Sequence, residues 1–148
     1  RPDGSVVRWQ LLYVGSDDLQ LDLPFFIQWD QPEQQRVQEL KSLGTIQNHP
    51  AGPIKIEEVS FVVGNFNTAR ALLKLCDFEH TQMTDSKLQA DVLKIHTPTG
   101  TLAFYSPTDE GDVWNMLMER GQSICSIVLA GAIESKVLHV ENANYVFQ

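Results

Sequence analysis

Alternation of apolar and polar residues along the chain predicts most of its strands. Val6–Val14 and Leu23–Asp30 are rich in β-branched and aromatic residues, and in Ile54–Val63 the apolar residues recur at every second position toward its end. Glu79–Lys87 is polar and only weakly strand-like. The remaining predicted strands are Leu88–His96 and Thr101–Ser106, joined by a turn at Thr97–Gly100, and Ser123–Gly131 and Lys136–Val146, joined as a hairpin around Ala132–Ser135.

Three other segments repeat their apolar residues at helical spacing. The first follows Asp30, which with Glu33 forms a capping-box pattern, and Gly44 ends it. The second begins at Asn65 or Asn67 and runs to about Phe78. Its apolar stripe consists of Ala69, Leu72, Leu73 and Cys76. The third covers Thr108–Arg120.

The order of these elements predicts the fold class. Strands outnumber helices, and several are joined by short turns. This order favours an α+β protein with a mostly antiparallel sheet covered by helices.

Composition and charge narrow the function classes. The 148 residues are 43% hydrophobic and 20% charged, which excludes disorder as the main state. The net charge of −8 disfavours binding to nucleic acid and to an anionic membrane, and no apolar run approaches the length of a membrane span. Two cysteines, Cys76 and Cys125, favour free thiols in a reducing compartment, so we expect a cytoplasmic protein.

Particular residues point to a known family. They are the opening Arg1-Pro2-Asp3-Gly4 with Arg8-Trp9, the run Leu23–Trp29 (LPFFIQW), the pair His49-Pro50, and a strand–helix–three-strand order over residues 54–106. Together they resemble the glyoxalase-like domain family of the vicinal oxygen chelate superfamily, whose members pair two βαβββ modules into a cupped sheet. The resemblance covers roughly residues 1–106.

The resemblance implies a division of the chain. Residues 1–53 would be the end of the first βαβββ module plus a linker helix, 54–106 the second module, and 107–148 a helix and a C-terminal hairpin extension. The chain begins without a methionine, so the opening elements of the first module would lie upstream of Arg1. Such a chain leaves a sheet edge open at Val6–Val14 or Leu23–Asp30, which favours a homo-oligomer; the alternative is that Ser123–Val146 folds back over that edge.

Metal enzymes of this superfamily place ligands on the cupped face of the sheet. The resemblance assigns three such positions to Gln28, Glu58 and Phe104. Phe104 has no metal-binding atom, so we expect no metal cofactor unless upstream residues or a partner subunit complete the site. Gln28 and Glu58 are expected on one sheet face, opposite the helix that packs on Val59 and Phe61.

Five residues are candidates for binding a small-molecule substrate: Arg8, Gln10, Gln28, His49 and Glu58. Arg8 would suit an anionic group and His49 a proton-transfer role, whereas the alternatives are a surface arginine and a loop histidine. For Gln28 and Glu58 the alternative is a solvated polar position. No catalytic residue is assigned, because the chain has no nucleophile elbow and no phosphate-binding loop.

Two functions remain open at this point. One is a lyase- or isomerase-type enzyme that acts on a small oxygenated or thiol-conjugated molecule in a cupped sheet. The other is a degenerate, non-catalytic module for binding or for assembly through its sheet edge. In both cases we expect a small molecule or a second copy of the chain as partner, and neither nucleic acid nor membrane.

Overall fold

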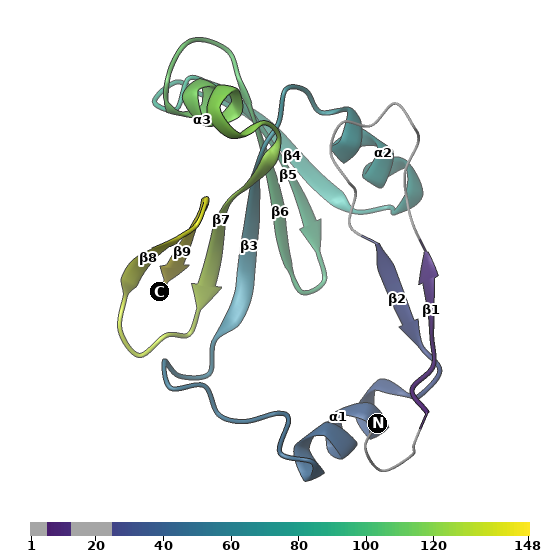
Figure 1. The fold of residues 1–148 in the computed structure, drawn as a ribbon. Coiled ribbons are helices and arrows are strands. Elements are labelled where there is room, and N and C mark those ends of the chain that lie inside the picture. Colours follow the sequence, from purple (N-terminus) through teal and green to yellow (C-terminus); the bar gives the residue numbers. More distant parts are fainter. Residues whose placement is uncertain (1–5, 13–24) are drawn as a thin grey trace.

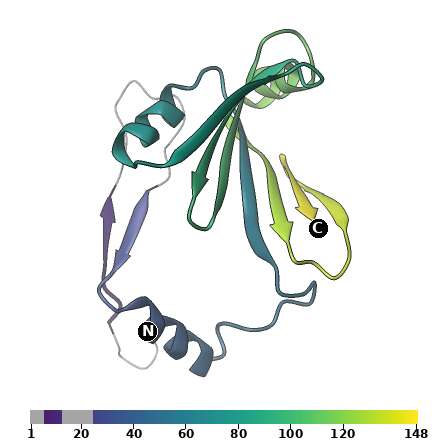
Figure 2. The same cartoon turned by 180° about the vertical axis from the view of Figure 1, so that it is seen from behind.

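The computed structural model describes residues 6–12 and 25–148, which form three helices and nine strands arranged in two sheets (Figures 1 and 2). Seven strands form one mixed sheet in the order β4-β5-β6-β3-β7-β9-β8, and β1 and β2 form a second sheet. The α+β prediction is confirmed. The predicted strand residues 13–14 and 23–24 lie outside the described part of the chain.

One half of the large sheet is a continuous βαβββ stretch. It consists of β3 (Lys55–Val62), α2 (Asn67–Leu75), β4 (Glu79–Asp85), β5 (Ala90–Thr97) and β6 (Gly100–Pro107). Strands β4, β5 and β6 pair as antiparallel neighbours, and β6 lies parallel to β3.

The other half of the sheet comes from the C-terminal part of the chain. It contains α3 (Asp112–Arg120), β7 (Ser123–Ala130), β8 (Lys136–Val140) and β9 (Ala143–Phe147). Strand β7 pairs antiparallel with β3, and β9 pairs parallel with β7. The two halves therefore meet along β3 and β7.

The predicted hairpin of two long strands at the C-terminal end is wrong. Lys136–Val146 is split into β8 and β9, which pair with each other, and β7 does not pair with β8. The break lies at Glu141, which has a φ of 50° and so reverses the chain direction. The hairpin is thus tighter than predicted, and its second strand returns to β7.

The two faces of the large sheet carry separate hydrophobic clusters. On one face α2 packs on Phe61, Val63 and Phe104, and the predicted stripe of Ala69, Leu72, Leu73 and Cys76 is confirmed as its buried side. On the other face α3 packs through Val113 on Val62 and Ala90. The period of two in β3 therefore sends neighbouring residues under different helices.

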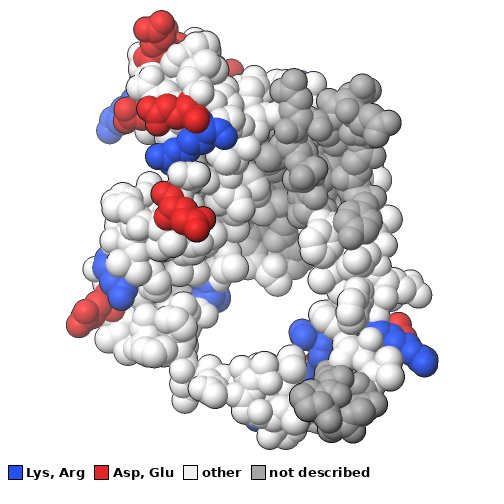
Figure 3. Space-filling view, in the orientation of Figure 1, with Lys and Arg blue, Asp and Glu red and all other residues white. Residues whose placement is uncertain are grey.

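The N-terminal part of the chain stands apart from this sheet. Strands β1 (Trp9–Leu12) and β2 (Phe26–Trp29) pair with each other, and α1 (Glu33–Ser42) follows. Figure 3 shows a wide opening between this part and the seven-stranded sheet. The final strands extend the sheet beside β3, so the alternative in which Ser123–Val146 folds back over the β1–β2 sheet does not occur.

Two local predictions for this part are wrong. The capping box does not form, because Glu33 instead binds the guanidinium of Arg36 at 2.7 Å and the start of α1 has no side-chain cap. Gln28 and Glu58 do not share a sheet face, because β2 and β3 belong to different sheets.

Candidate functional site

A cavity of about 250 Å³ lies on the α3 face of the seven-stranded sheet. Strands β3, β6, β7 and β9 form its floor, and α3 covers one end. Its polar lining consists of Glu58, Ser60, Tyr105, Cys125, Ser126 and Asn144, and its apolar lining of Val62, Leu88, Val113, Met116 and Val128. This volume is at the low end for small-molecule sites, so only a compact ligand fits.

An ion pair fixes the one acidic side chain of this cavity. The Lys94 ammonium on β5 donates to Glu58 Oε2 at 2.7 Å, and Ser60 Oγ donates to Glu58 Oε1 at 3.0 Å. The Glu58 side chain is 17% exposed. Burial alone lowers the pKa of Lys94, but the hydrogen bond and the charge of Glu58 outweigh it, so the pKa of Lys94 is raised. Lys94 is therefore charged at neutral pH, and its hydrogen bond holds the Glu58 carboxylate in one orientation.

Tyr105 brings a phenol to the same cavity. Burial, followed by the negative charge of Glu58, raises the pKa of Tyr105 above its usual value of 10. The side chain consequently keeps its proton at neutral pH, and its hydroxyl can donate a hydrogen bond to an oxygen of a ligand.

Cys125 lines the cavity as an unreactive thiol. Its Sγ donates to the carbonyl oxygen of Ser60 at 3.4 Å, and burial raises the pKa of the thiol to about 11. Because the thiolate is the nucleophilic form, Cys125 is a protonated thiol in the wall of the site rather than a nucleophile.

These donors do not suit a divalent metal ion. Each carboxylate oxygen of Glu58 already accepts one hydrogen bond, from Lys94 or Ser60, and Tyr105 and Cys125 keep their protons. In the part of the chain that the structure describes, no three His, Cys, Asp or Glu side chains gather as metal ligands. The arrangement instead presents hydrogen-bond donors and a fixed carboxylate beside an apolar wall.

The structure distributes the five sequence-predicted residues over four places. Glu58 alone lies in the cavity under α3. Gln10 and Gln28 are paired across β1 and β2, which puts them on one face of the small sheet. His49 lies in the loop before β3, where its Nδ1 accepts the Ala51 N–H at 3.1 Å.

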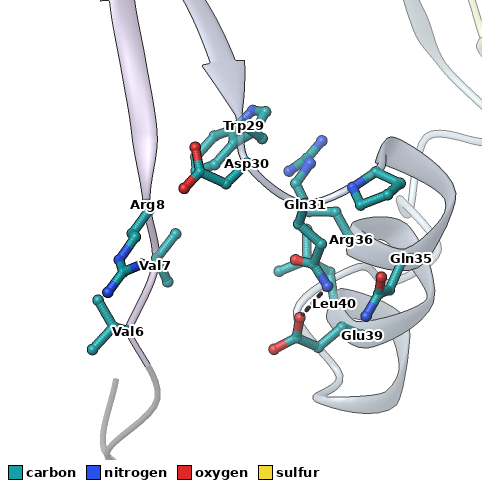
Figure 4. Close-up of a pocket in the computed structure, with 11 residues that line it drawn as sticks. Val6, Val7, Arg8, Trp29, Asp30, Gln31, Gln35, Arg36, Glu39 and Leu40 are labelled. Atoms are coloured by element: carbon teal, nitrogen blue, oxygen red, sulfur yellow. Dashed lines mark hydrogen bonds between the residues drawn. The ribbon is translucent and has the colours of Figure 1, made fainter.

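Arg8, the fifth of these residues, lines a groove of about 820 Å³ between the β1–β2 sheet and α1 (Figure 4). The groove is larger than the cavity under α3, but two of its polar side chains bind each other and a third is held by Glu33. Gln31 Nε2 donates to Glu39 Oε2 at 2.9 Å, and the Arg36 guanidinium binds Glu33 and lies 5.0 Å from the Trp29 ring centre. We therefore take the cavity under α3 as the candidate site.

Sequence reasoning missed most of the polar residues of this cavity. Lys94 and Tyr105 lie on strands that were predicted. Alternation along these strands puts both side chains on the face of Glu58, but only once the pairing of β5 and β6 with β3 is known. Phe104 is a correction: it was assigned to the cupped face, but it is buried under α2, stacked on Phe61 with ring centres 5.1 Å apart.

Residues 1–76 match the family described as Glyoxalase-like domain. No curated protein matches the chain. Among solved structures, a hypothetical protein of Bacillus halodurans C-125 is 11% identical with a TM-score of 0.51, and the match covers 65% of this chain and 95% of that one. Methylmalonyl-CoA epimerase of Mycobacterium tuberculosis is 9% identical with a TM-score of 0.49, covering 69% and 92%.

Proposed function

We propose that this chain, which belongs to the glyoxalase-like domain family of the vicinal oxygen chelate superfamily, binds a small oxygenated molecule in the cavity under α3. The observation that carries the proposal is the carboxylate of Glu58, held at 2.7 Å by Lys94 and at 3.0 Å by Ser60 inside a cavity that also contains a phenol. Buried polar groups fixed in this way are typical of ligand sites.

The lining defines the class of ligand. Tyr105 can donate to a carbonyl, carboxylate or hydroxyl oxygen, and Glu58 can accept from a hydroxyl or amide. The side chains of Val113, Met116 and Val128 offer an apolar wall for a hydrocarbon or thioether part. A small hydroxy or oxo compound, free or conjugated to a thiol, can both hydrogen-bond to the polar residues of the cavity and pack against its apolar wall.

A binding measurement tests this proposal. A panel of small hydroxy acids, oxo acids and their thiol conjugates is titrated against the protein by NMR and calorimetry. Tyr105→Phe removes one donor and is expected to weaken the best ligand about threefold to tenfold, the size of one neutral hydrogen bond. Tyr145→Phe is the matched control, because Tyr145 lies on β9 but does not line the cavity.

Equal weakening by both substitutions, or ligand shifts confined to residues around Arg8 and Trp29, would contradict the proposal. The second result would move the site to the groove beside α1. No binding by any member of the panel would favour the alternative function of this chain, a non-catalytic assembly module.

We further propose a cytoplasmic location. Cys76 and Cys125 are both free and partly buried, which suits a reducing compartment. In the described part of the chain no helix has the length and apolar character needed to cross a membrane. Cell fractionation with an antibody against the protein tests the location, and recovery with secreted proteins would contradict it.

A further inference from the structure

The seven-stranded sheet contains an approximate internal two-fold symmetry. On one side of its centre, β3 pairs parallel with β6, and β6 pairs antiparallel with β5. On the other side, β7 pairs parallel with β9, and β9 pairs antiparallel with β8. The antiparallel pair of β3 and β7 lies between the halves (Figures 1 and 2).

This symmetry is incomplete at one edge. Outside β5 the first half has a further antiparallel strand, β4, whereas no strand of the described chain pairs with the outer side of β8. The position that corresponds to β4 is therefore open beside β8. A strand added there would run antiparallel to β8, as β4 does to β5.

Strand β8 has the composition of an edge that accepts a partner. All five of its residues are exposed, including Val137 (52%), Leu138 (43%) and Val140 (49%). It contains no proline and no acidic residue. Its two basic side chains are held within the subunit, because Lys136 lies 5.1 Å from the centre of the Phe147 ring and His139 is bound to Asn144. Natural sheets protect free edges with charges, prolines or bulges; β8 has no proline, and the basic side chains it carries are turned to partners within the subunit.

We propose that β8 pairs antiparallel with β8 of a second copy of this chain, with Leu138 on the two-fold axis. In this register Leu138 faces Leu138 of the other copy, Val137 faces His139, and Lys136 faces Val140. No like charges stand opposite each other, and an apolar contact forms at the centre. The two sheets become one continuous sheet.

The opposite edge of the sheet is less suited to the same arrangement about its central residue. Strand β4 is also exposed over most of its length, but self-pairing centred on Gln82 would put Glu79 opposite Asp85 on both sides of the axis. Facing acidic side chains destabilise such a pair. The charges of the two edges therefore direct self-association to β8.

Charge substitutions on the axis test the interface. The whole chain is examined by sedimentation velocity and native mass spectrometry at micromolar concentrations, where we expect a species of about twice 16.7 kDa. Leu138→Lys and Leu138→Glu each put like charges opposite each other and should weaken association at least tenfold. Mixing the two variants puts opposite charges on the axis and should restore the dimer, which simple misfolding could not do. Gln82→Lys on β4 is the matched control and should leave the dimer unchanged.

Three results would overturn the proposal. They are a wild-type chain that stays monomeric over this range, Leu138 variants that remain dimeric on their own, and a dimer lost only in Gln82→Lys. Circular dichroism of each variant confirms that the sheet has formed before association is measured.

Discussion

At the scale of the residue, the candidate site depends on the ion pair between Lys94 and Glu58. Replacing Lys94 by Met leaves a largely buried carboxylate without its cation, so we expect a loss of about 1–2 kcal/mol in the free energy of unfolding at pH 7. The pKa of Lys94 is raised in the folded state, so the contribution of the pair is present below the usual lysine pKa of 10.5 and is lost as pH rises through the folded value. Urea unfolding between pH 7 and pH 11 measures both effects. Lys74→Met on the exposed side of α2 should change the free energy by less than about 0.5 kcal/mol.

Cys125 gives a second residue-scale prediction. Its pKa of about 11 lies about two pH units above the ordinary value of 9.0, so its thiolate fraction at pH 8 is about 100-fold lower than that of an unperturbed thiol. Iodoacetamide should therefore modify Cys125 about 100-fold more slowly in the folded protein than in urea, as measured by peptide mass spectrometry over time. Modification at the same rate in both states would show that the thiol is neither buried nor protonated as the structure has it.

Single residues also show which features of the site could be predicted from the sequence and which could not. Alternation in Ile54–Val63 was enough to predict that Glu58 faces away from α2, and the structure confirms this. The alternation did not determine how β6 pairs with β3. A shift of one residue in that pairing moves every side chain of β6 to the other face of the sheet. The family resemblance assigned Phe104 to the cupped face, although Tyr105 is the residue that lines the cavity. Register depends on hydrogen bonds between distant strands, which the local pattern does not contain.

At the scale of the element, α2 has one buried and one exposed side. Leu72 is 2% exposed in the cluster on the sheet, whereas Leu75, one turn further along, is 61% exposed. Leu72→Ala should lower the free energy of unfolding by about 2–4 kcal/mol, because it removes buried methyl groups and leaves a cavity. Leu75→Ala should change it by less than about 0.5 kcal/mol. Urea denaturation of both variants checks this difference, and equal losses would mean that the helix is rotated from its position in the structure.

Elements were predicted well where the periodic signal was long and unbroken. The apolar stripe of α2 repeats over two turns and predicted the buried side of the helix correctly. The prediction of one strand over Lys136–Val146 failed because its apolar residues have the composition of a single strand: Val137, Leu138, Val140 and Val146. The turn at Glu141 contains no glycine or proline that would indicate it.

At the scale of the whole molecule, we expect the two parts of the chain to differ in stability. Two-stranded sheets are marginal in water, and β1 and β2 form one with Leu12, Phe26 and Ile27 exposed. We propose that the boundary between the parts lies near residue 53, before β3. Amide hydrogens of residues 26–29 should exchange at least about 100-fold faster than those of residues 58–62, as measured by hydrogen-exchange mass spectrometry. Equal protection of both segments would show one cooperative unit.

The pairing of β3 with β7 has a consequence for how the protein folds. Gln148 donates at 2.7 Å to Glu57, which lies 91 residues earlier in the sequence, and the cavity under α3 needs side chains from both ends of this interval. Closing so long a loop has an entropic cost before any contact compensates it, and folding through such contacts is slow. Strands β3 to β6, within residues 55–107, can pair as soon as they are synthesised. The other side of β3 stays unpaired until β7 has been synthesised, and β9 then pairs with β7. During translation the protein thus passes through a state with half a sheet and an open edge at β3, the state in which it would be most exposed to aggregation and to chaperones.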